Sequence, residues 1–442
     1  MAKRNLIPNG DFAVGKVGEL PEGWSVTAAR PSLMPGFKLA RKAGRQVLLA
    51  EGNGNPDCVG FAALKVPVTL GKTYEFRAVF GMSKGVNPSE HVLLQCNGPG
   101  ANGGLHEFRR LEGGLAEGTA KIAYSGEGQG EVEVCVLLRL TAAGKVWVKE
   151  LSLVECEPVQ PRWVRVACTN GATNLASCEA ILDAAGQAGA DLALLPEYMQ
   201  GAFIPEPLRG DSYKLMAAKA KQYGMYVAGG IVRKEAERDL IFNTGLLLDR
   251  KGKFVGMYDK VHPYSPELNL EGVSVGRSVP VFETDFGTVG IMICYDSWFS
   301  DVAELLALKG AKLVLFPNAG YYRALMHARA ADNRMRIVVS SWNSGYGVWD
   351  TVGRDLTDPE GDRSHGDPPG LTHKDLVETK VGDVGLLMVS LDMNCSPSPH
   401  YNGGTMWEAP GGTRNRRDQA YFLEDERKAE RERWWEGEGT AK

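Results

Sequence analysis

The sequence predicts two classes of domain in one chain, an all-β domain followed by an α/β domain. Residues 5–155 contain short runs of alternating polarity, such as residues 74–80 and 131–138, separated by glycine-bearing turns. Many short strands with such turns are typical of a β-sandwich. Beyond residue 162, apolar strands alternate with segments whose apolar residues recur at helical spacing, and this pattern predicts a layered α/β domain ending near Asn394.

The domain boundaries follow from changes in composition along the chain. The proline-bearing segment 157–161 separates the two patterns, as a linker would. We therefore predict a β-sandwich in residues 1–157, an α/β domain in residues 162–394 and a C-terminal extension with a charged helix in residues 395–442. Residues 350–380 are polar and rich in Gly and Pro, which indicates a long loop.

Each element is predicted from its own local pattern. In the first domain, strands are expected where polarity alternates, at residues 66–70, 74–80, 131–138 and 145–153. In the second domain, helices are expected where apolar residues have helical spacing, at residues 174–189, 212–223 and 301–309. Short apolar runs predict the intervening strands, at residues 165–168, 192–195, 226–230, 289–294 and 313–316, with a hairpin at 246–255.

Length and composition exclude several classes of protein. The chain has 442 residues, enough for two or three domains, with 43% apolar and 24% charged residues. A net charge of −4 gives no indication of binding to nucleic acid or to an anionic membrane. No apolar run is long enough to span a membrane, and the N-terminus lacks the apolar core of a signal peptide. We expect a cytoplasmic protein; a secreted protein whose signal peptide is missing from this sequence stays open.

The eight cysteines show no CxxC or Cys/His clusters, which argues against a structural zinc site. Four of them lie in the first domain, at Cys58, Cys96, Cys135 and Cys156. We interpret these four as separate buried thiols, although they could pair in an oxidising compartment.

Three reactive side chains follow predicted strands of the α/β domain: Glu197, Lys260 and Cys294. Strand ends are where ligands meet catalytic groups in open α/β sheets. A thiol is only partly ionised at neutral pH, so it needs a base or a positive field to act as a nucleophile. The three groups together predict a nucleophile, its general base and an oxyanion stabiliser.

The segments around these residues resemble the signature segments of the nitrilase, or carbon–nitrogen hydrolase, superfamily. They are residues 195–198 (LPEY), 258–262 (YDKVH) and 290–296 (GIMICYD). The resemblance covers about residues 162–392. It implies a four-layer α-β-β-α sandwich, commonly dimerised through its outer helices into a homodimer or higher homo-oligomer. It also implies thioester chemistry with no metal or organic cofactor.

The resemblance further implies an accessory carboxylate after the lysine. Glu271 is the assigned candidate, and Glu267 is the alternative. It also implies that Asn318 lines the substrate pocket and that Tyr295, also assigned to the substrate site, helps Lys260 to stabilise the oxyanion through its backbone N–H. The aromatic side chains of Tyr198, Trp298, Tyr321 and Tyr322 are candidate walls of the pocket, and each of them is equally compatible with core packing.

The expected substrate is a small amide or N-carbamoyl compound. Tyr295 and Asp296 stand where nitrile-cleaving relatives usually carry Trp-Glu, so nitrile hydrolysis is not favoured. Two alternatives remain: an acyl transferase that uses the same thioester, and a carbohydrate-recognition protein whose α/β domain is inactive.

The first domain resembles galactose-binding-like jelly rolls in its opening residues 5–12 and in residues 70–76. The resemblance raises the possibility of a glycan ligand at this domain. Aromatic side chains that would stack on a sugar are Trp24, Tyr74 and Phe80, although all three are equally compatible with the core.

Overall fold

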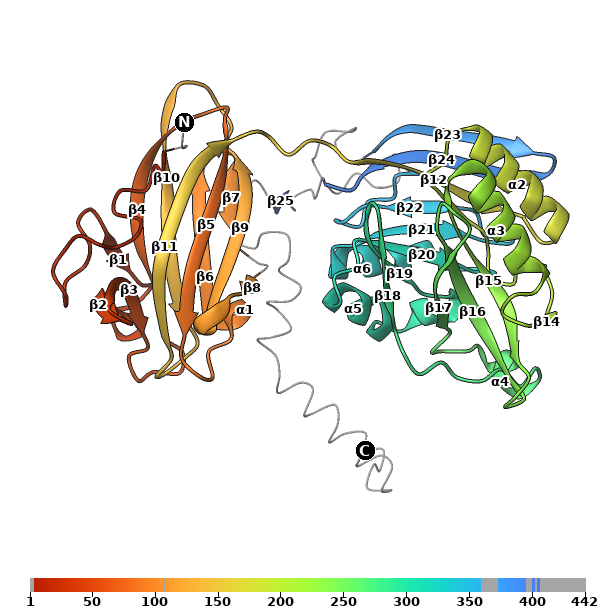
Figure 1. Ribbon diagram of the computed structural model, residues 1–442, viewed down its shortest axis with the longest axis horizontal. Helices are drawn as coiled ribbons and strands as arrows, with labels where there is room; N and C mark the ends of the chain where they lie inside the picture. The colour runs from red at the N-terminus through yellow and green to blue at the C-terminus, as the bar shows by residue number, and fades with distance from the viewer. Residues whose placement is uncertain (1–3, 106–107, 359–372, 395–399, 402–403, 406–442) are drawn as a thin grey trace, which may run out of the picture. The chain divides into compact units, whose positions relative to one another are not determined.

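The computed structural model describes residues 4–105, 108–358, 373–394, 400–401 and 404–405. The chain divides into two compact units, and the boundary between them lies between Val159 and Gln160 (Figure 1). The predicted extension after residue 394 lies outside the described residues, apart from the paired strands β25 (His400–Tyr401) and β26 (Gly404–Thr405).

The first unit consists of two antiparallel sheets, consistent with the predicted β-sandwich. The five-stranded sheet has the order β1 (Ser25–Thr27), β4 (Val59–Thr69), β10 (Gln129–Arg139), β6 (Val92–Gly98) and β7 (Ala101–Gly104). The six-stranded sheet has the order β2 (Gly36–Lys42), β3 (Arg45–Glu51), β11 (Lys145–Cys156), β5 (Thr73–Met82), β9 (Leu115–Ala123) and β8 (Phe108–Arg110). Short helical turns lie at η1 (Pro31–Leu33), α1 (Pro88–His91) and η2 (Glu112–Gly114).

One hydrophobic core fills the space between these two sheets, to which strand β4, for example, contributes the alternate residues Ala62, Leu64, Val66 and Val68. Trp24, Tyr74 and Phe80 belong to this core, with exposed fractions of 8%, 1% and 0%. None of the three can therefore offer a face to a sugar, so the suggestion that they stack on a glycan is wrong. Cys58, Cys96 and Cys135 are buried and Cys156 is half-buried, and no disulfide joins any two of these four residues.

The second unit contains two sheets. The larger has the order β17 (Phe254–Asp259), β16 (Leu240–Leu248), β15 (Tyr226–Glu235), β13 (Leu192–Leu194), β12 (Trp163–Asn170), β24 (Val384–Asp392) and β23 (His373–Val381), with β14 (Pro205–Glu206) beside β15. The smaller has the order β18 (Val281–Thr284), β19 (Gly287–Ile291), β20 (Leu313–Pro317), β21 (Arg336–Ser340) and β22 (Gly347–Trp349).

Helices cover the outer faces of both sheets, which gives the four layers of an α-β-β-α sandwich (Figure 1). Helices α2 (Leu175–Gln187) and α3 (Asp211–Tyr223) pack on the larger sheet, and α5 (Asp301–Leu308) and α6 (Arg323–Asn333) on the smaller. Strand β12 shows the alternation that this requires: Val166 and Cys168 face the smaller sheet, while Ala167 faces the helices.

Local sequence explains where these helices begin and end. The Asn174 side chain accepts a hydrogen bond from the backbone N–H of Ser177, and the Ser177 hydroxyl bonds back to Asn174, so α2 starts with a capping box. Helix α3 ends at Tyr223, and the following residue, Gly224, takes the left-handed conformation (φ 64°) typical of a C-terminal cap.

The structure departs from the expected elements in two places. Strand β19 ends at Ile291, and Cys294 instead opens the short 3-10 helix η3 (Cys294–Trp298). The prediction of one loop through 350–380 is wrong at its end, because residues 373–381 form β23 and pair with β24. Residues 359–372 of that segment lie outside the described residues.

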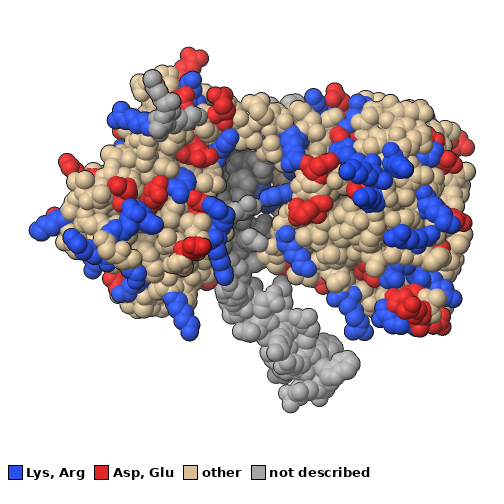
Figure 2. All heavy atoms as spheres, viewed as in Figure 1, with Lys and Arg blue, Asp and Glu red and all other residues tan. Residues whose placement is uncertain are grey.

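The surface of each unit mixes both signs of charge. Figure 2 shows Lys and Arg interspersed with Asp and Glu on the visible face of each unit, in keeping with the net charge of −4. Within the described residues, no helix is both long enough and apolar enough to cross a membrane.

Candidate active site

Cys294 lies in the tight turn that begins the helix η3, shortly after β19 ends at Ile291. Its φ of 44° is unusual for a residue with a side chain, and such strain is often found where a group is presented for reaction. The turn is held by Asp296, whose carboxylate accepts the backbone N–H of Ile293 at 2.8 Å. The Cys294 thiol lies 3.7 Å from the carbonyl oxygen of Gly320.

Glu197 follows β13 and is almost fully buried, with 3% of its surface exposed. Its Oε1 atom accepts hydrogen bonds from Asn243 Nδ2 at 2.6 Å and from Lys260 Nζ at 2.8 Å. Its Oε2 atom accepts the backbone N–H of Ala319 at 2.9 Å. Donors therefore hold both oxygens, and the carboxylate has a single orientation.

Lys260 follows directly after β17 and is 1% exposed. Its Nζ atom lies between two carboxylates, 2.8 Å from Glu197 Oε1 and 2.7 Å from Glu267 Oε2. Burial by itself would lower the pKa of Lys260, but the negative charges of the Glu197 and Glu267 carboxylates raise the pKa well above its usual range. The side chain is therefore a permanent cation.

The structure brings Glu267, rather than Glu271, to the lysine. Glu267 lies in α4 (Ser265–Asn269), is 6% exposed and also accepts hydrogen bonds from Tyr198 Oη and Asn243 Nδ2, both at 2.7 Å. Burial opposes ionisation of Glu267, yet the Lys260 charge and these hydrogen bonds lower its pKa. Glu271 is half-buried, and no described residue forms a hydrogen bond or ion pair with its carboxylate.

The thiol of Cys294 is electrostatically linked to the same groups. Burial and the nearby Glu197 carboxylate raise the pKa of the Cys294 thiol to about 12, although Lys260 and the Ala319 backbone N–H act to lower it. A thiol with this pKa is protonated at neutral pH. It can react only if a nearby base takes its proton as the new bond forms.

Two residues of this network were not identified from the sequence. Asn243 is fully buried in β16, and its amide nitrogen bridges the Glu197 and Glu267 carboxylates. Trp342 donates its indole N–H to the Glu197 backbone oxygen at 2.6 Å. The only signal for Asn243 was a polar pair, Asn243-Thr244, inside an otherwise apolar strand.

Two glycines allow backbone segments to approach the candidate catalytic residues closely. A Cβ atom at Gly230 would lie 2.7 Å from Glu197 Cα, and one at Gly276 would lie 1.9 Å from the Asp259 carbonyl oxygen. Both separations are shorter than van der Waals contact, so neither position accepts a side chain without movement of the backbone next to Glu197 or Lys260.

The predicted substrate-binding residues fall into two groups. Tyr198 and Asn318 are buried, with exposed fractions of 7% and 0%, and Asn318 Oδ1 has no hydrogen-bond partner among the described residues. Tyr295 and Trp298 instead belong to an aromatic rim beside Cys294. The rim is formed by rings with centroids 5.1–6.1 Å apart and comprises Tyr264, Tyr295, Trp298, Phe299 and Tyr322.

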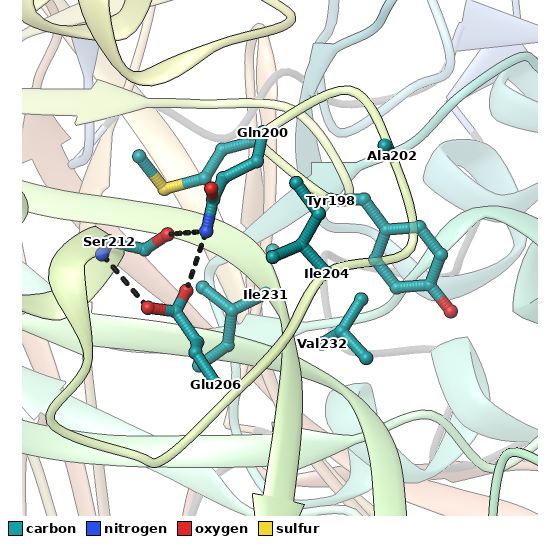
Figure 3. A pocket seen from close by; sticks show the side chains of 10 residues that line it. Tyr198, Gln200, Ala202, Ile204, Glu206, Ser212, Ile231 and Val232 are labelled. Carbon is teal, nitrogen blue, oxygen red and sulfur yellow. Dashed lines mark hydrogen bonds between the residues drawn. The ribbon is translucent and has the colours of Figure 1, made fainter.

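A small pocket lies behind Tyr198 (Figure 3). Tyr198, Ile204 and Val232 line its apolar side, and a polar group lies opposite. In that group Gln200 donates to Glu206 and to Ser212, while the Glu206 carboxylate accepts the backbone N–H of Ser212 in the first turn of α3. Because these polar groups satisfy one another and α3, we interpret the pocket as support for the Tyr198 segment rather than as the substrate site.

No group of three or more His, Cys, Asp or Glu side chains in the described parts of the chain has the arrangement of a metal site.

Comparison with known proteins places this geometry in a family. Residues 158–353 match the family described as "Carbon-nitrogen hydrolase". These residues form a carbon–nitrogen hydrolase domain. The match spans all the residues bonded into the Glu197 and Lys260 network, as well as Cys294.

Curated relatives of the hydrolase domain include omega-amidases. The omega-amidase of Danio rerio is 28% identical over 191 residues, which are 38% of this chain and 69% of the relative. An omega-amidase of Xenopus laevis is 29% identical over 186 residues, 37% of this chain and 67% of the relative. Among solved structures, Nit3 of Saccharomyces cerevisiae, a member of the nitrilase superfamily, is 19% identical over 54% of this chain and 93% of its own, with a TM-score of 0.44.

Proposed function

We propose that the hydrolase domain cleaves the carbon–nitrogen bond of a small amide or N-carbamoyl compound through a thioester on Cys294. The observation that carries this proposal is the buried Glu197–Lys260–Glu267 network beside a strained, half-buried thiol. The omega-amidase relatives support the amide as the substrate class.

In the first half-reaction, Glu197 acts as the general base. As the sulfur of Cys294 attacks the substrate carbonyl carbon, the thiol proton passes to the Glu197 carboxylate. The tetrahedral intermediate then collapses, the carbon–nitrogen bond breaks, and protonated Glu197 returns the proton to the leaving nitrogen. Ammonia or an amine departs and an acyl thioester remains.

In the second half-reaction, water attacks the thioester carbon, and Glu197 takes the proton of that water. The carbon–sulfur bond breaks, the carboxylic or carbamic acid leaves, and the proton returns to the Cys294 sulfur. The enzyme ends in its starting protonation state, as a catalytic cycle requires.

The oxyanion of both tetrahedral intermediates requires fixed positive groups. In this proposal Lys260 and the backbone N–H of Tyr295 supply them. Lys260 suits the role because its charge is permanent, and Glu267 keeps the ammonium group in place. We therefore propose Glu267, instead of Glu271, as the accessory carboxylate.

The aromatic rim favours amides that carry an apolar or planar group. Trp298 and Tyr322 are 50% and 62% exposed beside the nucleophile, so their ring faces are available to a substrate. Tyr198 has a different role, because its hydroxyl donates a hydrogen bond to Glu267 and so helps to fix the position of that carboxylate.

The test is a screen of ammonia release over amides, N-carbamoyl amino acids, N-carbamoyl amines and nitriles. We expect kcat/KM for the best amide or carbamoyl compound to exceed that for the best nitrile, and Cys294→Ala to lose turnover while keeping its Tm. Hydrolysis that continues undiminished in Cys294→Ala, or a preference for nitriles, would contradict the proposal.

A further inference from the structure

We propose that Asp296 is a positioning residue that joins the Lys260 segment to the Cys294 turn and so sets the separation between the ammonium group and the thiol. This inference rests on the proposed function, because it assigns Asp296 a role through Lys260 and Cys294.

Asp296 is fully buried and lies two residues after Cys294 in η3. One oxygen, Oδ2, accepts the backbone N–H of Ile293 and the hydroxyl of Tyr258, both at 2.8 Å. The other, Oδ1, accepts the backbone N–H of His262 at 2.9 Å. Both oxygens of this carboxylate are therefore engaged by donors from within the domain.

These donors come from two different sheets. Ile293 follows β19 of the smaller sheet, and its bond to Asp296 closes the turn that presents Cys294. Tyr258 lies in β17 of the larger sheet, and His262 follows the same strand. The hydrogen bond to Ile293 is sufficient to cap the turn. A capping role for Asp296 therefore does not explain its hydrogen bonds to Tyr258 and His262.

The bonds to the larger sheet surround Lys260 in the sequence. Tyr258 Oη also accepts the backbone N–H of Val261 at 3.1 Å, so Asp296, Tyr258 and His262 hold the residues on both sides of Lys260. One carboxylate thus connects the backbone that carries the oxyanion-stabilising ammonium group to the backbone that carries the nucleophile.

The surroundings of His262 match this arrangement. Its ring stacks on Phe299 with centroids 4.3 Å apart, and Nδ1 lies 3.1 Å from Asp296 Oδ1. Its Nε2 atom lies 3.4 Å from Asp301 Oδ2. The hydrogen bond to Asp296 raises the pKa of His262, because the buried carboxylate stabilises a positive charge on the imidazole.

The first experiment compares Asp296→Asn with a matched variant, Asp350→Asn, on the best amide of the screen. Asp350 is also a buried aspartate, 1% exposed, that accepts two backbone N–H groups, from Val352 and Arg354. We expect Asp296→Asn to lower kcat about 100-fold with KM within about 3-fold, because small misplacements of reacting groups have effects of this size. Asp350→Asn should keep kcat within about 3-fold at a comparable loss of Tm.

The second experiment measures alkylation of Cys294 by iodoacetamide, which needs no substrate and so separates this inference from the proposed function. We expect alkylation to slow about 10-fold in Asp296→Asn and to stay unchanged in Asp350→Asn. Tyr258→Phe, which removes only one hydroxyl, should lower kcat about 10-fold. This variant tests the role of Asp296 if Asp296→Asn does not fold. The assignment is wrong if Tyr258→Phe keeps the wild-type kcat and the wild-type alkylation rate. It is also wrong if the losses of kcat and alkylation rate in the two aspartate variants only follow their losses of Tm.

Discussion

Glu197 and Glu267 place two carboxylates in a buried space that contains one ammonium group, Lys260. Two like charges at this proximity repel, and burial penalises each of them. The amide nitrogen of Asn243 offsets part of this cost, because it donates to both carboxylates. Lys260 and Asn243 together therefore stabilise the two carboxylates, and the stability of the site depends on the lysine.

Replacing this lysine should therefore destabilise the fold as well as stop the reaction. Lys260→Met leaves two buried carboxylates without their cation, and removal of one partner from a buried ion pair typically costs about 3–5 kcal/mol. We expect the free energy of unfolding in urea to fall by about that amount. Glu271→Gln is the control: its half-buried carboxylate has no bonded partner among the described residues, so a change under about 0.5 kcal/mol is expected. Equal stability of Lys260→Met and the native protein would contradict the charge argument.

The thiol itself should be protonated over the whole neutral range. Since burial and Glu197 raise the pKa of Cys294 to about 12, the thiolate forms only at strongly alkaline pH. The difference in absorbance at 240 nm between the native protein and Cys294→Ala should stay near zero from pH 6 to pH 9. A step of one thiolate with a midpoint near pH 6 would show a preformed thiolate and would remove the need for Glu197 as the base.

At the scale of elements, the proposed catalytic groups come shortly after strands of the two sheets, where backbone segments approach one another closely. Gly230 in β15 lies against the Glu197 backbone, where an added Cβ would meet Glu197 Cα at 2.7 Å. We expect Gly230→Ala to lower kcat about 10- to 100-fold without removing any reactive group, because it displaces the general base. Gly36→Ala in β2 is the control, since the nearest atom to its added Cβ lies 3.8 Å away. A similar kcat for Gly230→Ala and the native protein would show that Glu197 tolerates displacement.

Much of this arrangement could be predicted from the sequence because it depends on local patterns. The periodicity that predicts helices at 174–189, 212–223 and 301–309 is confirmed by α2, α3 and α5. Glu197, Lys260 and Cys294 were identifiable because each follows an apolar run and lies in a segment resembling a family signature.

The rest depends on contacts between residues distant in the sequence. Asn243 looks like any polar residue in a strand until the fold places it between two carboxylates. The structure was also needed to show that Glu267, and not Glu271, bonds to Lys260 Nζ, because both glutamates follow Lys260 closely in the sequence and α4 brings only Glu267 to it. The 3-10 turn at Cys294 could not be predicted from the sequence, because the preceding apolar run continues past the end of β19.

At the scale of the whole molecule, each unit has its own hydrophobic core, and all the site residues lie in the second unit. A fragment beginning at Glu157 keeps the contacts at the start of that unit, where Asn394 Nδ2 donates to the Gln160 carbonyl and Arg162 N to Asp392. We expect this fragment to fold and to retain kcat/KM within about 3-fold on a small amide. A fragment that is folded, with a cooperative thermal transition, yet inactive would mean that the first unit contributes to the site.

In the proposed mechanism, Cys294 forms a covalent thioester with the acyl part of an amide. Intact-protein mass spectrometry after mixing with the best amide of the screen and rapid acid quenching tests it most directly. We predict an added mass equal to the acyl group, located on Cys294 by peptide mapping, lost on treatment with hydroxylamine and absent from Cys294→Ala. Steady turnover with no adduct on Cys294 at any quench time, or the same adduct in Cys294→Ala, would contradict the account.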